Sequence, residues 1–167
     1  GRDIAIELSQ RGYKLILVSR DIQKLEELKS IIKTESEIVI MDLTIEENCK
    51  KLFEKYKDID ILVNNAGFGD CGNFDETSLD KDIKMIKTNI IAYHILTKLY
   101  LKEMIQKDSG KILNVASIAG FMPGPLMTTY YSTKSYVVRL SESIREELRR
   151  RKSNVQISIL CPGPVNI

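Results

Sequence analysis

Ile59-Asp60-Ile61-Leu62-Val63, followed directly by Asn64-Asn65-Ala66-Gly67, is the stretch that decides the class of fold. The five-residue run is typical of a buried strand, and the four residues after it are amides and small side chains. Small residues let a ligand approach the backbone, and open parallel sheets bind ligands at the carboxyl ends of their strands. We therefore expect a strand of a parallel sheet that ends at a ligand site.

The same alternation of short apolar runs and amphipathic stretches continues on both sides of this stretch. Further strands are expected at 14–19, 38–41, 111–115 and 155–160, and helices at about 4–8, 22–32, 49–56, 79–106 and 129–150. The first of these strands is apolar throughout, which predicts burial of both faces, and Gly12 can end the helix before it. Strands separated by such helices imply right-handed crossovers and an α/β fold, with a parallel sheet covered on both faces. No linker or repeat divides the sequence, so we expect one domain over residues 1–167.

The composition indicates a globular protein and argues against two classes of partner. The 167 residues are 43% hydrophobic and carry a net charge of +2 with both signs interspersed, so no large positive field favours nucleic acid. No apolar run approaches the ~20 residues that a membrane helix needs. The three cysteines are scattered without a CxxC pair, which predicts reduced thiols in a cytoplasmic protein and no metal site. The basic run at 149–152 is expected to close a helix.

Tyr130 and Lys134 carry the strongest chemical signal. They are four residues apart in a predicted helix, so they share one face about one turn from each other. A free phenol titrates near ~10, and bringing its pKa to roughly 7 needs about 4 kcal/mol. One ammonium at ~4 Å supplies about that much at an effective dielectric constant of ~20, so we expect a second cation to assist. An oxidised nicotinamide would be such a cation, which points to hydride transfer.

Together with Ser117 and Asn89, this pair resembles the catalytic set of the short-chain dehydrogenase/reductase family. The loop at 117–125 resembles the family's bacterial branch of uncharacterised oxidoreductases. The resemblance covers the whole sequence and implies a Rossmann-type, doubly wound, three-layer parallel sheet. It implies that Tyr130 exchanges a proton with the substrate oxygen and that Ser117 hydrogen-bonds this oxygen. Lys134 would hold the nicotinamide ribose and lower the pKa of the phenol, and Asn89 would support a proton-relay water. Ordinary alternatives are a turn at Ser117 and a helix kink or a local capping bond at Asn89.

The resemblance also implies a nicotinamide dinucleotide cofactor. Besides Tyr130 and Lys134, the residues expected to bind it are Gly1, Arg20, Asp42, Leu43, Asn65, Ala66, Gly67, Pro162, Gly163 and Val165. Arg20 stands where an acidic residue would hold the adenosine ribose. Because a guanidinium pairs well with a 2′-phosphate, NADP(H) is favoured over NAD(H). Asp21 follows directly and is expected to weaken that preference.

The two ends depart from the family's pattern. Gly1 matches only the last glycine of the family's glycine-rich turn, whose helix N-terminus receives the pyrophosphate. Neither the rest of that turn nor the strand before it stands in the sequence, and Ile167 replaces a usual threonine. Without that strand, two sheet edges would be exposed beside a gap. We therefore expect a functional protein that continues beyond both ends of this sequence.

The expected function is reversible hydride transfer between NADP(H) and a small carbonyl or alcohol substrate. A nucleotide-binding regulatory or scaffold protein on the same fold is the main alternative, and sugar-nucleotide epimerisation is a second. The family resemblance further implies a homodimer or homotetramer joined through the helices at 79–106 and 129–150.

Other side chains near the expected site carry weaker expectations. Tyr131 lacks the spacing to Lys134, and either packing or a role in the site remains open for it. His94 is expected to pack or to lie on the surface. Four apolar residues between the predicted serine and tyrosine line either a substrate pocket or a core beneath a loop: Phe121, Met122, Leu126 and Met127.

Overall fold

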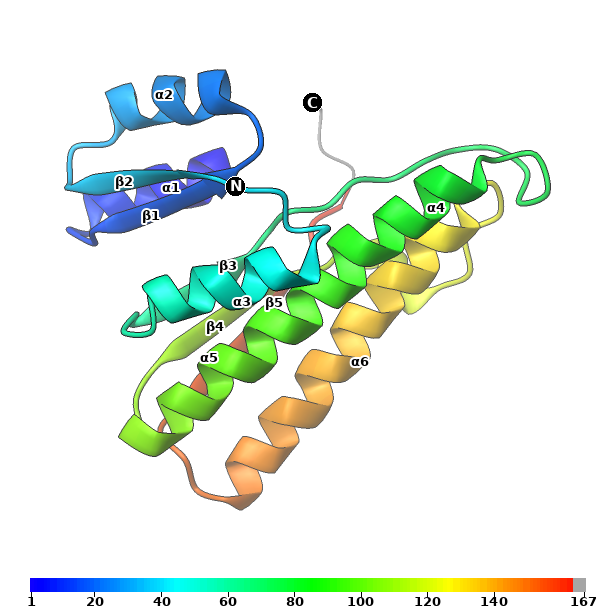
Figure 1. The fold of residues 1–167 in the computed structure, drawn as a ribbon. Coiled ribbons are helices and arrows are strands. Elements are labelled where there is room, and N and C mark those ends of the chain that lie inside the picture. The colour runs from blue at the N-terminus through cyan, green and yellow to red at the C-terminus, as the bar shows by residue number, and fades with distance from the viewer. Residues whose placement is uncertain (164–167) are drawn as a thin grey trace. The chain divides into compact units, whose positions relative to one another are not determined.

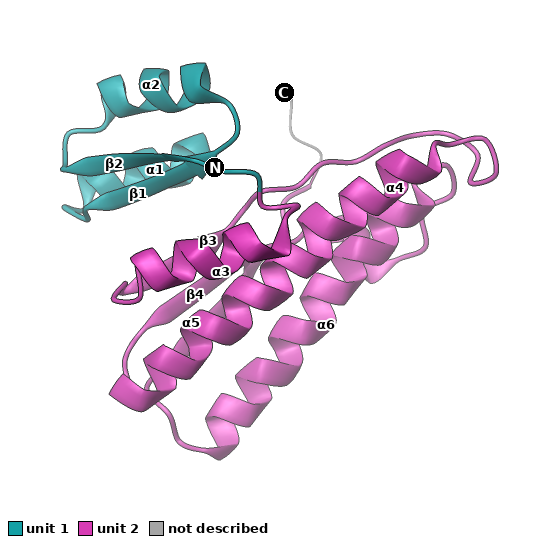
Figure 2. Ribbon diagram, viewed as in Figure 1, with its two compact units in different colours: residues 1–42 teal, residues 43–167 magenta. Residues whose placement is uncertain are grey.

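The computed structural model describes residues 1–163 and confirms an α/β fold with parallel strands (Figure 1). The chain divides into two compact units, Gly1–Asp42 and Leu43–Ile167 (Figure 2). The strands form two parallel sheets, one in each unit. A single domain over residues 1–167 stays a prediction.

The first unit contains α1 (Arg2–Gln10), β1 (Leu15–Ser19), α2 (Ile22–Ile31) and β2 (Ser36–Ile40). β1 and β2 pair in parallel. A small core joins the elements through three buried side chains, namely Ala5, Leu17 and Leu25.

Gly12 ends α1 as predicted. Its φ of +88° lies in the left-handed region that glycine adopts without strain. The amide of Gly12 donates to the Ser9 carbonyl at 3.0 Å, and that of Tyr13 donates to the Leu8 carbonyl at 3.1 Å. These two bonds are those of a Schellman motif, which satisfies the last carbonyls of a helix.

The prediction that β1 is buried on both faces is wrong. Leu17 is buried, whereas Ile16 is 37% exposed. Within the first unit β1 pairs with β2, and the core residues gather around Leu17. An apolar run without alternation therefore does not by itself establish burial on two sides.

The second unit builds a three-stranded sheet, in the order β3-β4-β5, with helices on one face (Figure 1). Its strands are β3 (Ile61–Asn64), β4 (Lys111–Val115) and β5 (Gln156–Leu160). Its helices are α3 (Glu46–Lys55), α4 (Leu79–Ile86), α5 (Tyr93–Lys107) and α6 (Thr128–Arg150), with the short segments η1 (Lys87–Ala92) and η2 (Ile118–Phe121). Because all three strands are parallel, their carboxyl ends meet at one edge of the sheet, where ligands are expected.

The helix predicted over 79–106 is interrupted by a wide turn. It runs as α4, then η1 with π-helical hydrogen bonding, then α5. The spacing of apolar residues along 79–106 predicts that Ile83, Ile86, Ile90, Tyr93, Tyr100 and Met104 lie near one face. After the wide turn Tyr93, Tyr100 and Met104 are buried as this predicts. Before the wide turn the prediction is wrong at Ile83, which is 43% exposed while Met85 is fully buried. A π-turn adds one residue to the helical repeat and so shifts the buried positions along the sequence.

Several surface features agree with the sequence. The basic run at 149–152 does close a helix, since α6 ends at Arg150, and Arg149 and Arg150 pair with Glu146. All three cysteines are free thiols. Over residues 1–163, no helix combines the length and the apolar character needed to cross a membrane.

Candidate active site

α6 presents Tyr130 and Lys134 on one side, as their spacing predicts. The Lys134 Nζ lies 5.8 Å from the centroid of the Tyr130 ring. Lys134 is 4% exposed, and Tyr130 is half-buried. The Lys134 ammonium donates to the carbonyl of Val115 at 3.0 Å, and Val115 is the last residue of β4. The pair therefore lies at the carboxyl edge of the sheet.

Burial governs the charge of Lys134. Desolvation lowers the pKa of Lys134 to about 8, against a smaller opposing effect of Cys161. At pH 7 the ammonium is still the dominant form. It can therefore stabilise a phenolate nearby and donate hydrogen bonds to hydroxyl groups of a ligand.

Asn89 lies in the wide turn η1 and joins two other parts of the site. Its Nδ2 donates to the Phe68 carbonyl at 2.9 Å and to Thr133 Oγ1 at 3.0 Å, and its Oδ1 accepts from the Phe68 amide at 3.2 Å. These bonds hold the loop after β3 to α6 beside Lys134. The helix irregularity that was an alternative for Asn89 is present, whereas its side-chain bonds reach outward and do not cap its own helix. Its role toward a relay water stays a prediction.

The loop after β3 has an exposed backbone without bulky side chains, so a flat ligand can lie against it. A Cβ atom on Gly67 would lie 3.0 Å from Asn89 Oδ1 and 3.5 Å from Lys134 Nζ, so a larger residue would crowd both groups. Ala66 and Gly67 are exposed, and the space around Gly163 after β5 is open. An exposed backbone beside a buried lysine fits the ribose and nicotinamide of a dinucleotide, which need donors and close contact.

A network of buried amide and hydroxyl side chains holds the ends of β3 and β4 in place. Asn64 donates to Asn114 Oδ1 at 2.9 Å and to Thr97 Oγ1 at 3.0 Å, and Asn114 donates to Ser141 Oγ at 2.9 Å. All four residues are buried. The network gives this edge of the sheet a fixed polar support, because a buried polar side chain is stable only with its partners in place.

Ser117 is the N-cap of η2 and stands two residues after the end of β4. Its Oγ accepts from the Ala119 amide at 3.2 Å and lies 3.5 Å from the Pro162 carbonyl. A contact of 3.5 Å is at the long limit for a hydroxyl donor, so the hydroxyl hydrogen can turn to a better acceptor. The turn that was the alternative interpretation of Ser117 is present. Its contact to a substrate oxygen stays a prediction.

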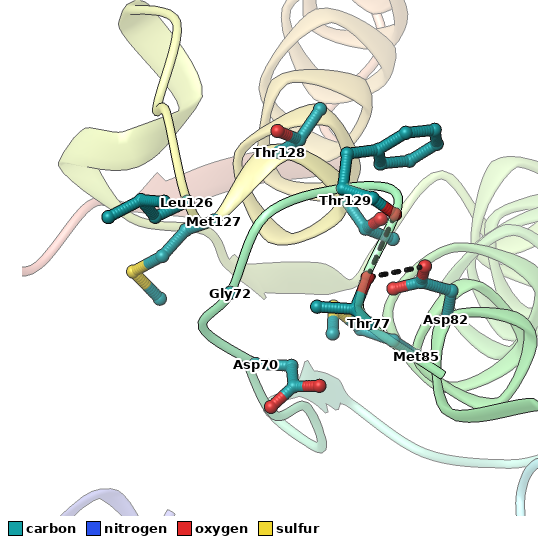
Figure 3. Close-up of a pocket in the computed structure, with 10 residues that line it drawn as sticks. Asp70, Gly72, Thr77, Asp82, Met85, Leu126, Met127, Thr128 and Thr129 are labelled. Atoms are coloured by element: carbon teal, nitrogen blue, oxygen red, sulfur yellow. Dashed lines mark hydrogen bonds between the residues drawn. The ribbon is translucent and has the colours of Figure 1, made fainter. Parts of the chain in front are cut away.

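Two loops meet above the start of α6 (Figure 3). The Gly72 amide donates to the Leu126 carbonyl at 2.8 Å, which ties the loop before α4 to the loop before α6. Thr77 bonds the Phe74 carbonyl and Asp82 at the same place. A small pocket lies between the two loops, lined in part by Asp70, Met85 and Met127.

The apolar side chains of the second loop face outward. Phe121, Met122 and Leu126 are 54%, 52% and 52% exposed, so the alternative of core packing does not apply to these three. A Cβ atom on Gly69 would lie 3.3 Å from Met127 Cε and 3.1 Å from the Tyr130 ring, which places Met127 beside the tyrosine.

The two uncertain residues of the sequence have ordinary partners. The Tyr131 ring covers Gly124 so closely that a Cβ atom at this position would clash with the ring. His94 Nδ1 lies 2.7 Å from the Tyr136 hydroxyl, which agrees with a packing role.

In the first unit, Arg20 and Asp42 follow β1 and β2 and form an ion pair. Arg20 Nη1 lies 3.7 Å from Asp42 Oδ2, and the side chains are 52% and 34% exposed. Asp21, expected to weaken an NADP(H) preference, is instead the N-cap of α2. It accepts from the Lys24 amide at 3.1 Å, and this hydrogen bond lowers the pKa of Asp21. The carboxylate that pairs with Arg20 is Asp42, and the effect of Asp21 on the cofactor preference stays a prediction.

The remaining predicted cofactor residues lie at chain ends and strand ends. Gly1 holds the N-cap position of α1, and Leu43 opens the second unit. Asn65 follows β3, and the Pro162 carbonyl accepts from the Ile118 amide at 3.1 Å. Val165 lies outside the described residues.

Sequence reasoning missed two contributors to the site. Thr133 receives a bond from Asn89, and the buried hydroxyl of Tyr93 donates to the Val115 carbonyl at 3.3 Å. Tyr93 stands four residues after Asn89, so the spacing that revealed Tyr130 and Lys134 could have revealed this second pair.

Comparison with known proteins gives one consistent result. The family model described as short chain dehydrogenase matches residues 1–167. The very-long-chain 3-oxoacyl-CoA reductase of Macaca fascicularis is 34% identical over 166 residues, which cover 93% of this chain and 53% of the relative. The uncharacterized oxidoreductase YvaG of Bacillus subtilis is 31% identical, with 98% and 63% covered.

A solved structure gives the same result. A metagenomic short-chain oxidoreductase in complex with NADP superimposes with a TM-score of 0.87 at 29% identity, covering 99% of this chain and 77% of that one. The chain thus spans about half to two thirds of the length of the two curated relatives named above.

Proposed function

Because the chain belongs to the short-chain dehydrogenase family, we propose that it is an NADP(H)-dependent oxidoreductase acting on a carbonyl or alcohol group. One observation carries the proposal. The ammonium of Lys134, the ring of Tyr130 and the exposed backbone at Gly67 gather at the carboxyl edge of a parallel sheet. A dinucleotide bound there would supply or accept the hydride.

The chain's own residues would manage the proton and the substrate oxygen. Tyr130 donates its phenolic proton to the oxygen of a carbonyl as that oxygen becomes an alkoxide, and Ser117 donates a hydrogen bond to it. The Lys134 ammonium stabilises the resulting phenolate. Asn89 fixes the loop after β3 against α6, so that Lys134 and the ligand-facing backbone keep one geometry.

The cofactor preference rests on charge in the first unit. Arg20 is half exposed and offers a guanidinium that can bind a 2′-phosphate, so we propose NADP(H) over NAD(H). Asp42 holds that guanidinium at 3.7 Å and must share it with the phosphate. Solved structures similar to this chain include a complex with NADP and a complex with NAD, so the proposed preference rests on Arg20.

The substrate that fits best carries an apolar group next to its carbonyl. Phe121, Met122 and Leu126 expose their side chains on the loop between Ser117 and Tyr130. Burial of such surface by a ligand yields about 25 cal/mol per Å². The relative from Macaca fascicularis, by its name, reduces 3-oxoacyl-CoA compounds, which are ketones with long apolar chains.

The decisive experiment measures NADPH oxidation by the purified protein with aliphatic and aromatic ketones and aldehydes. Tyr130→Phe should lower kcat by a factor of about 10² to 10⁴, because it removes the general acid. Tyr131→Phe is the matched control and should leave the rate nearly unchanged, since that ring packs on Gly124. Equal rates for wild type and Tyr130→Phe would sink the catalytic proposal.

A non-catalytic nucleotide-binding role is the alternative from the sequence. It predicts NADPH binding without turnover that depends on Tyr130. Sugar-nucleotide epimerisation is distinguished in the same assay, because it returns the nicotinamide to its starting state and consumes no NADPH.

We also propose a homodimer or homotetramer through α4, α5 and α6. Leu79 and Ile83 of α4 are 73% and 43% exposed, an apolar surface that a partner helix could cover. Light scattering at micromolar concentration tests this, and a monomer alone would contradict it. Leu79→Lys with Ile83→Lys should dissociate the assembly.

A further inference from the structure

Two buried donors converge on a single carbonyl oxygen at the end of β4. The Val115 carbonyl accepts from Lys134 Nζ at 3.0 Å and from the Tyr93 hydroxyl at 3.3 Å. Lys134 and Tyr93 are 4% and 2% exposed. The proposed reaction gives Lys134 a task and gives Tyr93 none.

We propose that Tyr93 is a positioning residue that keeps the Val115 carbonyl hydrogen-bonded and so lets Lys134 turn from it to the cofactor. This inference rests on the proposed function, because it concerns how the same lysine becomes available. Lys134 holds the Val115 carbonyl when no ligand is bound. When its ammonium donates to a ligand instead, the Tyr93 hydroxyl remains as a donor to this oxygen.

The energetic reason is the cost of leaving without a donor a part-buried carbonyl that faces two buried side chains. Removing the only donor to such a group typically changes an equilibrium by about tenfold or more. With Tyr93 in place, the carbonyl loses one of two donors and keeps the other. Breaking the hydrogen bond between Lys134 and the Val115 carbonyl then reduces the affinity for the cofactor only slightly.

Tyr93 is held in place to serve as that donor. Its ring packs in a core cluster with Ala116, Val137 and Val138, so it has little freedom to move away. Burial, with a smaller effect of Tyr130, raises the pKa of Tyr93, and the phenol therefore keeps its proton at neutral pH. Its ring centroid lies 5.8 Å from Lys134 Nζ, within the range of a cation–π contact.

The wide turn places this residue. Tyr93 is the first residue of α5 and follows Asn89 by four positions. The same segment therefore supplies Asn89 to Thr133 and Tyr93 to Val115, one residue pair on each side of Lys134.

The test uses Tyr93→Phe, which keeps the ring and removes the hydroxyl, and measures the Kd for NADPH by titration calorimetry. We expect the Kd to rise about tenfold, because release of Lys134 now leaves the carbonyl without a donor. Tyr136→Phe is the matched control, since that hydroxyl bonds His94 and should leave the Kd unchanged. Without ligand, Tyr93→Phe should unfold at nearly the wild-type temperature, because Lys134 still holds the carbonyl.

The same substitution in the Lys134→Met variant distinguishes a positioning role of Tyr93 from a purely structural role. In Lys134→Met no ammonium has to leave the carbonyl, so adding Tyr93→Phe should have no further effect on the Kd. An unchanged Kd for Tyr93→Phe alone would overturn the inference while NADPH binding by the wild type upholds the proposed function. An equal loss in both backgrounds would also overturn it, in favour of a purely structural role. No NADPH binding by the wild type would defeat both proposals.

Discussion

Polar residues follow the strands in both units, but those of the second unit are more deeply buried than those of the first. In the second unit Asn64, Asn114 and Lys134 are 5%, 0% and 4% exposed and have fixed partners. In the first unit the side chains of Arg20 and Asp42 are 52% and 34% exposed, and their ion pair spans 3.7 Å. Buried polar groups are costly to leave unpaired, whereas exposed ion pairs contribute about 0 to 1 kcal/mol. The geometry of the proposed active site is therefore expected to be rigid, and the proposed cofactor preference is expected to be easy to change.

The variant expected to have the largest effect removes Asn114, the central residue of the buried hydrogen-bond network. Asn114→Leu leaves the Asn64 amide without one acceptor and Ser141 Oγ without its donor. We expect a loss of about 3 to 4 kcal/mol in the free energy of unfolding, measured with urea. Asn73→Leu, at an exposed amide, is the control and should change it by less than about 0.5 kcal/mol. Similar small losses for both variants would contradict the contrast.

Replacing Lys134 should have the next largest effect, and it should raise the free energy of unfolding instead of lowering it. Burial lowers its pKa to about 8, while the unfolded chain keeps the ordinary value near ~10.4. Between about pH 8 and 10.4 the unfolded state binds more protons, so this residue makes the free energy of unfolding rise with pH in that window. Below the window the full burial penalty of the ammonium remains. Lys134→Met should therefore stabilise the protein by about 2 to 3 kcal/mol at pH 7 and remove that rise.

The measurement for Lys134→Met is urea unfolding of both proteins from pH 6 to 10.5. The difference between the two curves isolates this residue from other groups that titrate in the window. The stabilised variant should also lose NADPH oxidation, the usual relation between stability and an active site. A difference that stays constant with pH would show that the lysine titrates normally.

Arg20 should matter for the cofactor and little for the fold. Arg20→Ala should weaken NADPH binding roughly tenfold and NADH binding little, because the 2′-phosphate loses its partner. The free energy of unfolding should change by less than about 0.5 kcal/mol, since the Arg20–Asp42 pair is exposed. Titration calorimetry with NADPH and with NADH measures both affinities. An equal loss of affinity for the two cofactors would exclude recognition of the 2′-phosphate by Arg20.

Asp42→Asn should give the smallest change. It frees Arg20 from a competing carboxylate, so NADPH should bind roughly two- to threefold more tightly. The gain should shrink as salt is raised from 50 to 500 mM, because exposed charges are screened. Weaker NADPH binding would mean that Asp42 contacts the cofactor directly, as the family resemblance suggests.

The sequence predicted the elements well wherever local pattern decides them. The strand at 111–115 and the end of α1 at Gly12 follow from apolar runs and from glycine's left-handed conformation. The pair Tyr130 and Lys134 follows from a four-residue spacing. The wide turn at η1 could not be predicted, because nothing in its side chains marks a π-helical bond pattern. The burial of β1 was overestimated, since an apolar run does not say how many faces have neighbours.

Contacts between distant segments explain what was missed in the site. Asn64 meets Asn114 and Thr97 only after three elements pack, and Tyr93 reaches Val115 across the boundary of helix and sheet. The ion pair of Arg20 with Asp42 joins two strand ends that are distant in the sequence, whereas the adjacent Asp21 caps α2. Residue type identified the chemistry, and only tertiary structure identified the partners.

The wide turn at η1 has a consequence for the protein's history and for its redesign. One inserted codon would turn the second part of a regular helix by about 100° against the first, and a π-turn takes up that extra residue. Deleting one residue between Lys87 and Ala92, with Asn89 kept, should therefore close the wide turn into a regular α-helix and leave Tyr93 beside the sheet. Laboratory evolution by substitution alone would leave this turn untouched, whereas libraries with single-residue deletions would find it to be the most tolerant point of the helix.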